Sequence, residues 1–161
     1  MSTKIIGTSP PRNDARAKVT GQARYAGDYF VPHMLIGKVL RSPHAHALVK
    51  NIDTSEAEAL PGVEAVLTPY NTPRNMYPTA GHPYSLDPTR GDVADKTILT
   101  MKARYVGDEI AAVVAADEQT AASALKLIKV DYELLEPVLT PEEAIKEETP
   151  LIHEERNSNV I

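Results

Sequence analysis

The clearest pattern of apolar and polar residues begins at Glu109. From Glu109 to Ala116 the chain carries Ile110, Val113 and Val114 among alanines, an apolar run without alternation. A short continuous run of this kind is typical of a strand that is covered on both faces. The Gly107-Asp108 pair before it indicates a turn. We therefore predict a buried strand that starts directly after a turn.

The pattern that follows the strand predicts a helix. Asp117 can accept hydrogen bonds from the first free N–H groups of a helix, and Glu118 places a negative charge near its positive end. Apolar residues then recur at spacings of four and three, and two lysines are expected in the last turn: Ala121, Leu125, Ile128, Lys126 and Lys129. Val130 to Leu134 alternates again, as a strand with one exposed face does. The region predicts a β-α-β unit.

Shorter patterns upstream predict further strands. Met34–Arg41 and His46–Asp53 are rich in β-branched and apolar residues, and the four residues Ser42–Ala45 between them favour a hairpin. Gly21–Phe30 alternates enough to predict a short strand, interrupted at Gly27-Asp28. Val63–Leu67 predicts another strand.

Two short helices complete the predicted elements. Thr54–Leu60 is expected to be helical, with a capping box formed by Asp53 and Glu56 or by Ser55 and Glu58, and Pro61-Gly62 ends it. Together with its flanking strands it predicts a second β-α-β unit, from His46 to Leu67. Thr140, Pro141 and Glu143 form a helix start, and this helix is expected to run to about Glu147.

Three segments lack a sustained period. Met1–Thr20 is expected to be a loosely ordered arm, and Pro150–Ile161 carries few core residues and is expected to be a linker. Pro69–Thr97 contains five prolines and two glycines. Loops longer than about 12–15 residues are uncommon in compact domains and are usually functional or disordered.

Composition narrows the class of protein. The chain has 161 residues, which predicts one domain, and a net charge of -5, which argues against nucleic-acid binding. No apolar run is long enough for a membrane span or a secretory signal, so we expect a cytoplasmic protein. The sequence contains no cysteine, which excludes disulfides, thiolate metal sites and iron–sulfur ligation by this chain.

The histidines are the first candidates for chemistry. His44 and His46 are two residues apart, a spacing that a metal pair on one strand face would use. Catalytic zinc normally has three protein ligands, and a third is not obvious here. The alternative is a polar hairpin end in which the histidines hydrogen-bond to the backbone.

Other candidate motifs favour structural roles. Gly107-Asp108-Glu109 lacks a phosphate-loop pattern and precedes a strand, so an acidic turn is expected. Ser42 is not within a GxSxG motif, which argues against a nucleophile. Arg41 could bind a carboxylate or phosphate bidentately, although a surface ion pair is the more common use. A cluster of acidic residues is expected to form a solvated helix face: Glu142, Glu143, Glu147 and Glu148. The residues alone predict no catalytic constellation.

The order of several motifs resembles the N-terminal α/β hammerhead domain of the molybdenum hydroxylases, the xanthine dehydrogenase and aldehyde oxidase family. The resemblance covers about Thr20 to Val160 and rests on six motifs in sequence: GQARYAGD (21–28), LRSPHAHA (40–47), LPGVEAVLT (60–68), RYVGDEIAAVVA (104–115), VDYELLEPV (130–138) and PLIHEERNSNV (150–160).

The resemblance implies an α+β fold with mixed sheets, two main helices and a short C-terminal helix. It divides the chain into an arm (1–19), a hammerhead domain (20–148) and a linker (149–161) toward a molybdopterin-binding region. Complete enzymes of this family hydroxylate aldehydes or nitrogen heterocycles and use molybdopterin-bound molybdenum, [2Fe-2S] clusters and usually FAD. The family's catalytic glutamate and pterin contacts lie downstream of the hammerhead, so the resemblance assigns no catalytic, cofactor or metal residue to this chain.

The expected role is therefore structural, in contact with molybdopterin domains and with iron–sulfur and flavin domains or subunits. We expect the contact to involve two exposed turns: Arg41, Ser42, His44 and His46 in one, and Tyr105, Gly107, Asp108 and Glu109 in the other. The loop Pro69–Thr97 is expected to face a substrate entrance or a partner. A weak homodimer is also plausible on this interpretation, and the alternative function is a free-standing module that binds a small ligand or a protein.

Overall fold

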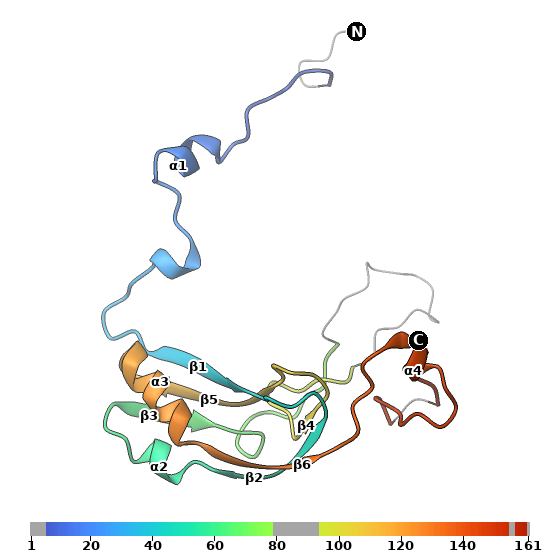
Figure 1. Ribbon diagram of the computed structural model, residues 1–161. Helices are drawn as coiled ribbons and strands as arrows, with labels where there is room; N and C mark the ends of the chain where they lie inside the picture. The colour runs from blue at the N-terminus through green and yellow to red at the C-terminus, as the bar shows by residue number, and fades with distance from the viewer. Residues whose placement is uncertain (1–5, 79–93, 155–156, 161) are drawn as a thin grey trace. The chain divides into compact units, whose positions relative to one another are not determined.

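A computed structural model describes residues 6–78, 94–154 and 157–160 of the chain. By its internal contacts the chain divides into two units, Met1–Met34 and Leu35–Ile161. The first unit contains one short helix, α1 (Ala15–Val19), and a 3-10 turn, η1 (Ala26–Asp28). The second unit contains all six strands of the described part and its remaining helices (Figure 1).

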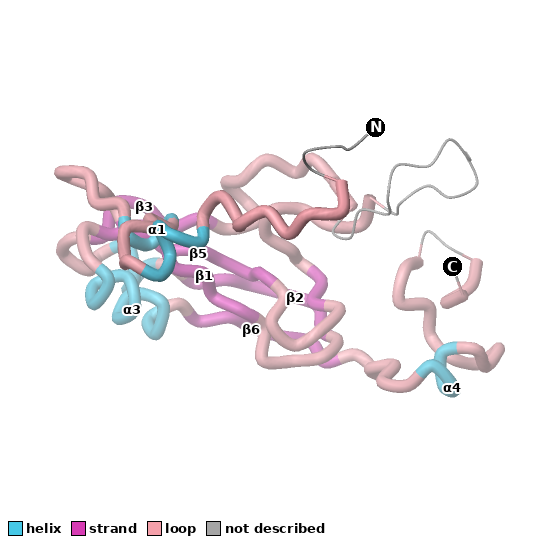
Figure 2. Tube along the Cα trace, turned by 90° about the horizontal axis from the view of Figure 1, so that it is seen from above, coloured by secondary structure: helices cyan, strands magenta, loops and turns pink. Residues whose placement is uncertain are grey.

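The strands of the second unit form two three-stranded sheets. One sheet has the order β1 (Ile36–Arg41), β5 (Glu109–Ala115), β3 (Val63–Leu67). The other has the order β4 (Lys102–Ala103), β2 (Ala47–Asp53), β6 (Lys129–Leu134). Every strand pairing in both sheets is antiparallel. Figure 2 shows the strands from above, with α3 beside them.

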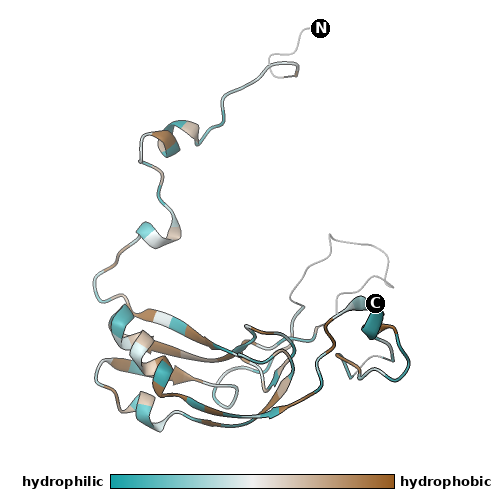
Figure 3. Ribbon diagram, viewed as in Figure 1, coloured by the Kyte–Doolittle hydropathy of each residue, from teal (hydrophilic) through white to brown (hydrophobic). Residues whose placement is uncertain are grey.

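The core lies between the sheets and under α3 (Glu118–Leu127). Ile110 and Val113 on β5 are its largest fully buried side chains, and Val49 and Ile52 on β2 join the same cluster. On the face of β5 opposite Val113, Ile110 is buried but Ala112 and Val114 are only partly buried, so the predicted cover of both faces is incomplete. The hydrophobic colour in Figure 3 follows the strands, while α2 (Ser55–Glu58) and α3 carry hydrophilic residues.

The predicted α3 and its cap are confirmed. Asp117 has an extended backbone and its side chain accepts a hydrogen bond from the N–H of Thr120, at 2.8 Å. Ala121 and Ala124 are the buried residues of the helix, whereas Leu125 is partly buried. Lys129 lies outside the helix, at the start of β6, where it pairs with Asp53, so its predicted place in the last helical turn is wrong.

The predicted hairpin between β1 and β2 is wrong. β1 pairs with β5, so that Lys38 lies opposite Val113, and β2 pairs with β4 and β6. The connection does not close a local turn, because Ser42 exchanges backbone hydrogen bonds with the turn before β5 instead. Likewise, β5 and β6 belong to different sheets, as do β2 and β3, so each predicted β-α-β unit connects two sheets.

Two further local predictions are wrong. Gly21–Phe30 is not a strand: the N–H of Tyr25 donates to Asp28 Oδ2 at 2.8 Å and the N–H of Asp28 donates to Tyr25 O at 2.9 Å, which closes η1. Neither predicted capping box forms at α2, where Thr54 is the N-cap. Asp53 instead accepts from the N–H and hydroxyl of Ser55, at 3.0 and 2.6 Å.

The chain after β6 contacts its own unit. Thr140 caps α4 (Pro141–Ala144) by accepting from the N–H of Glu143, as predicted, but the helix ends at Ala144 and not near Glu147. Arg104 Nε donates to the carbonyl of Ile152 at 3.1 Å, and Lys102 forms an ion pair with Glu154 at 2.9 Å. That this segment leads to another domain stays a prediction.

Part of the proline-rich loop Pro69–Thr97 falls on residues 79–93, which lie outside the described residues. Its two described ends meet, because Tyr77 and Lys96 exchange backbone hydrogen bonds of 2.8 and 3.2 Å. The prediction that the loop faces a substrate entrance or a partner stays a prediction. No helix in the described part of the chain is both long and apolar enough to cross a bilayer.

Candidate functional site

The structure brings the two predicted contact turns together. The N–H of Ser42 donates to the carbonyl of Asp108, and the N–H of Gly107 donates to the carbonyl of Ser42, both at 2.8 Å. The turns meet because β1 ends where β5 begins in the antiparallel pair. Gly107 has a φ of 101°, a left-handed conformation that glycine adopts without steric cost. The two turns therefore form one hydrogen-bonded structure.

Ser42 serves the backbone of its own turn. Its hydroxyl donates to the carbonyl of His44 at 2.9 Å and accepts from the N–H of His44 at 3.0 Å. The residue is 2% exposed. A hydroxyl committed in this way fixes a turn, which agrees with the expectation that Ser42 is not a nucleophile.

Asp108 is the buried centre of the second turn. It is 3% exposed, and its carboxylate accepts from the N–H groups of Arg104 and Glu109, each at 3.1 Å. Lys96 Nζ lies 3.4 Å from the same carboxylate. Hydrogen bonds and a cation offset the cost of burying the charge. The predicted acidic turn is present, but its carboxylate faces inward.

The prediction that all eight contact residues are exposed is wrong for three of them. Ser42, His46 and Asp108 are buried because each turn covers the other and the segment after β6 covers His46. Arg41 and Tyr105 are exposed, and His44, Gly107 and Glu109 are partly buried. Contact of this surface with another domain stays a prediction.

Glu109 joins the turns through two cations. Arg41 Nη1 donates to Glu109 Oε1 at 2.6 Å and to the carbonyl of Gly107 at 2.7 Å, and Lys96 forms a second ion pair with Glu109. Partial burial raises the pKa of Glu109. The hydrogen bonds from Lys96 and Arg41 lower it by more than burial raises it, so the pKa lies below its usual value. Arg41 therefore binds a carboxylate, although one of its own chain.

Lys96 is the member of this cluster that the sequence did not indicate. Partial burial lowers its pKa, but hydrogen bonds to Glu109 and Tyr105 and the charge of Asp108 raise it by more, so the pKa lies above its usual value. Its ammonium lies 4.9 Å from the centroid of the Tyr105 ring and binds the hydroxyl, so the contact is at the ring edge. A lysine whose amine stays protonated in this way holds the neighbouring carboxylates in place and does not act as a nucleophile.

The two histidines have separate surroundings. His46 Nδ1 lies 2.7 Å from the carbonyl of Glu136, and since a carbonyl only accepts, Nδ1 carries the proton. His44 packs edge-on against Tyr132, with ring centroids 4.9 Å apart. Among the described residues, no group of three potential metal ligands occurs. The alternative of a backbone-bonded histidine is confirmed for His46.

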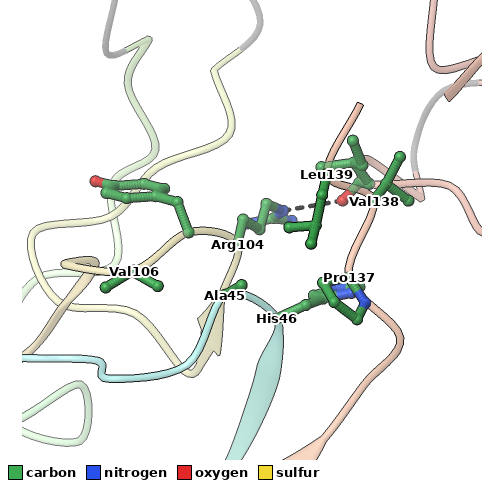
Figure 4. Close-up of a pocket in the computed structure, with 9 residues that line it drawn as sticks. Ala45, His46, Arg104, Val106, Pro137, Val138 and Leu139 are labelled. Carbon is green, nitrogen blue, oxygen red and sulfur yellow. Dashed lines mark hydrogen bonds between the residues drawn. The ribbon is translucent and has the colours of Figure 1, made fainter. Parts of the chain in front are cut away.

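A hollow of about 260 Å³ opens beside the turns. Figure 4 shows His46 and Arg104 on one side, and on the other the segment after β6 that carries Pro137 and Leu139. Its rim is apolar and open to solvent: Tyr105 is 45%, Val106 65% and Leu139 71% exposed. We call Tyr105, Val106, Leu139 and the adjacent Arg41 the turn surface. A hollow with an apolar rim beside a hydrogen-bonded turn can receive a side chain from a neighbouring protein surface.

Comparison with known proteins finds relatives over nearly the whole chain. The probable hypoxanthine oxidase XdhD of Escherichia coli K12 is 43% identical over 152 residues, which cover 94% of this chain and 16% of that protein. The xanthine dehydrogenase molybdenum-binding subunit of Escherichia coli O157:H7 is 44% identical over 142 residues, covering 88% of this chain and 19% of that subunit. The chain thus spans less than one fifth of these two relatives.

Solved structures agree on the fold. The aldehyde oxidoreductase of Desulfovibrio desulfuricans superposes with a TM-score of 0.79 at 35% identity, over 93% of this chain and 17% of that one. A reconstituted CO dehydrogenase from Oligotropha carboxidovorans superposes with a TM-score of 0.73 at 38% identity, over 92% of this chain and 18% of that one. The predicted α+β hammerhead class is confirmed.

The match to a known protein family covers a defined part of this chain. The family described as "Aldehyde oxidase and xanthine dehydrogenase, a/b hammerhead domain" matches residues 20–136. This range contains both contact turns, the core strand β5 and helix α3. It also begins inside the first unit, before the sheets. The chain belongs to the aldehyde oxidase and xanthine dehydrogenase α/β hammerhead domain family.

Proposed function

We propose that this chain is the N-terminal hammerhead part of the molybdopterin-binding subunit of a xanthine dehydrogenase or aldehyde oxidase-like enzyme, and that its role there is structural. The observation that carries the proposal is the asymmetry of the match. The relatives align with 88–94% of this chain but only 16–19% of their own length. The reaction proposed for the complete enzyme is the oxidative hydroxylation of aldehydes or nitrogen heterocycles.

The sequence of this chain does not fit the iron–sulfur clusters of such an enzyme. Iron–sulfur clusters are held mainly by cysteine thiolates, and the sequence has none. The described residues contain no group of three potential metal ligands. We therefore assign the iron–sulfur clusters to other parts of the complete enzyme, and the resemblance to the family assigns molybdopterin and FAD to other parts as well.

The turn surface is the proposed contact with those other parts. The two turns are fixed by backbone hydrogen bonds and by the ion pairs of Glu109. Binding of another domain to them therefore costs little conformational entropy. Three apolar side chains, Tyr105, Val106 and Leu139, are exposed beside the hollow. The hollow, at about 260 Å³, is smaller than the roughly 300–1,000 Å³ of typical small-ligand sites, which favours a docking role for this hollow.

Assembly tests this proposal. The 161-residue chain is co-expressed with the molybdopterin-binding remainder of the subunit from the same genome, and the complex is recovered by affinity and size-exclusion chromatography. Val106→Asp buries a charge in the proposed contact and should lower recovery of the complex at least about 10-fold. The double variant Arg41→Ala, His44→Ala should lower it as well, with the domain still folded by circular dichroism.

Gln119→Asp is the matched control, because it adds the same charge at the exposed start of α3. α3 follows the end of β5 that lies opposite the turns, so this variant should assemble as the wild type does. Failure of the wild-type chain to co-purify would overturn the proposed function. Normal assembly of Val106→Asp would overturn the assignment of the contact to the turn surface.

A further inference from the structure

The segment 25–34 lies in the first unit and also within the part of the chain that matches the family. The family match begins at residue 20, but the unit that contains both sheets begins at Leu35. Residues 25–34 therefore follow the family pattern although they belong to the other unit. A segment that packed on nothing would not need large apolar side chains, yet this one carries Tyr25, Tyr29, Phe30 and Val31.

The exposure of these side chains is high. Phe30 is 83% exposed, Val31 59% and Tyr29 58%. Phe30 is also the sole phenylalanine of the sequence. Three consecutive exposed apolar side chains are a candidate contact with another protein surface, because aromatic residues such as tyrosine and phenylalanine are enriched at the centre of protein interfaces.

A hydrogen-bonded turn fixes each end of this triplet. On the N-terminal side, Asp28 and Tyr25 exchange hydrogen bonds of 2.8 and 2.9 Å and close η1. On the C-terminal side, the N–H of Met34 donates to the carbonyl of Val31 at 3.0 Å. The segment is thus shaped by hydrogen bonds among its own residues.

The second turn contains a strained residue. His33 has a φ of 62°, and among the described residues it is the one non-glycine with a positive φ. Proline at the second position of a turn, positive φ at the third, and a hydrogen bond from the fourth N–H to the first carbonyl define a type II turn. Val31, Pro32, His33 and Met34 have these features. A non-glycine residue held in this region is strained, and such residues concentrate at binding sites.

We propose that residues 25–34 form a preformed docking peptide that inserts Phe30 into an apolar groove on the molybdopterin-binding remainder of the same subunit. This inference rests on the proposed function. The occupant follows from covalent linkage: in the Escherichia coli relative, the matched region is 19% of one molybdenum-binding subunit, so the remainder is present at high effective concentration. The two turns lower the entropy lost on binding, because the triplet already has its bound shape.

Protease protection is the direct test. Chymotrypsin cleaves after tyrosine and phenylalanine, so the isolated wild-type chain should be cut rapidly after Tyr29 and Phe30. In the purified complex with the molybdopterin-binding remainder, cleavage at these two bonds should slow at least about 10-fold, as followed by mass spectrometry. Phe30→Ala should raise the Kd of the complex about 30-fold, since full burial of a phenylalanine contributes on the order of 2 kcal/mol.

Val19→Ala is the matched control. Val19 is 84% exposed and lies in the same unit but outside the segment, so its replacement should change the Kd less than about 2-fold. The melting temperature of each variant checks that the second unit stays folded.

Two substitutions at His33 distinguish the effect of the turn conformation on binding from the effect of the histidine side chain. His33→Gly keeps the positive φ at no steric cost and should bind within about 3-fold of the wild type. His33→Val disfavours that conformation, because a β-branched residue rarely adopts it, and should raise the Kd about 5- to 10-fold. Equal binding by the two variants would overturn the role of the preformed turn.

The outcomes distinguish this inference from the proposed function. A wild-type complex in which Tyr29 and Phe30 are still cleaved rapidly would overturn the docking peptide and leave the proposed function standing. Protection that requires an iron–sulfur subunit, or that rises with the concentration of the isolated chain, would identify a different occupant and overturn the inference. Absence of any complex would overturn both.

Discussion

At the scale of single residues, the charged side chains around the two turns stabilise the structure and do not form a catalytic group. Asp108 accepts two backbone hydrogen bonds, and Glu109 binds Arg41 and Lys96. Each of these carboxylates therefore has its partners within the chain. A carboxylate that acts as a general base would need one oxygen available to a substrate. The cluster instead holds two turns and the end of a loop in fixed positions.

Glu109 makes the stability of the domain dependent on acid. Its pKa lies below the usual 4.5, because the lowering by Lys96 and Arg41 exceeds the raising by partial burial. A group whose pKa is lowered by folding stabilises the protein above its unfolded pKa, and this contribution is lost as the pH falls through the folded pKa. We expect the wild type to lose free energy of unfolding as the pH falls from about 5 to 3.

Glu109→Gln isolates this effect. The variant should be less stable than the wild type at pH 7 but should lose less stability on acidification, and urea titrations at several pH values measure both quantities. Asp131→Asn, at an exposed position of β6, serves as the control and should retain the wild-type slope. Identical slopes for Glu109→Gln and the wild type would contradict the argument.

At the scale of elements, the cap of α3 is the feature that most clearly determines where a helix begins. Asp117 accepts from both the N–H and the hydroxyl of Thr120, each at 2.8 Å. Asp117→Ala should lower the free energy of unfolding by about 1 kcal/mol, because an unfilled N-cap leaves helical N–H groups without an acceptor. Asp117→Asn keeps an acceptor and should recover most of the loss. Denaturant unfolding measures both, and equal stability of alanine and asparagine variants would refute the capping role.

Elements with local causes could be predicted from the sequence. β5, α3, β6 and β3 and the caps Asp117 and Thr140 depend on residues within a few positions of one another. The pairing of strands could not be predicted in this way. A connection of four residues between β1 and β2 favours a hairpin, yet the partner of β1 is a strand about 70 residues away.

The candidate site shows the same limit. The sequence indicated both turns but not that they cover each other, so the burial of Ser42 and Asp108 was missed. Lys96 was missed because it lies in a loop without periodicity and reaches Glu109 only after the loop returns beside Tyr77. The order of family motifs supplied the fold class, which periodicity alone did not.

At the scale of the whole molecule, the division into two units predicts that the sheets are stable without the first unit, residues 1–34. The core cluster contains no residue before Ile36, and the described residues of the first unit are exposed or half-buried. Removal of residues 1–34 should therefore change the melting temperature by less than roughly 4 °C, by the usual relation between melting temperature and free energy. Calorimetry measures this, and the full-length chain is its control. A much larger decrease would show that the arm contributes to the core.

The antiparallel pairings also determine when the polypeptide can acquire its shape during synthesis. β1, β2 and β3 leave the ribosome first. β1 and β3 both pair with β5, which is synthesised later, and β2 pairs with the short β4 and then with the longer β6. Closing such distant pairs lowers conformational entropy before it forms contacts, so folding dominated by them is slow. About two thirds of the chain must therefore be synthesised while its early strands still have unsatisfied edges, and those edges are the part of the nascent protein that chaperones would have to shield.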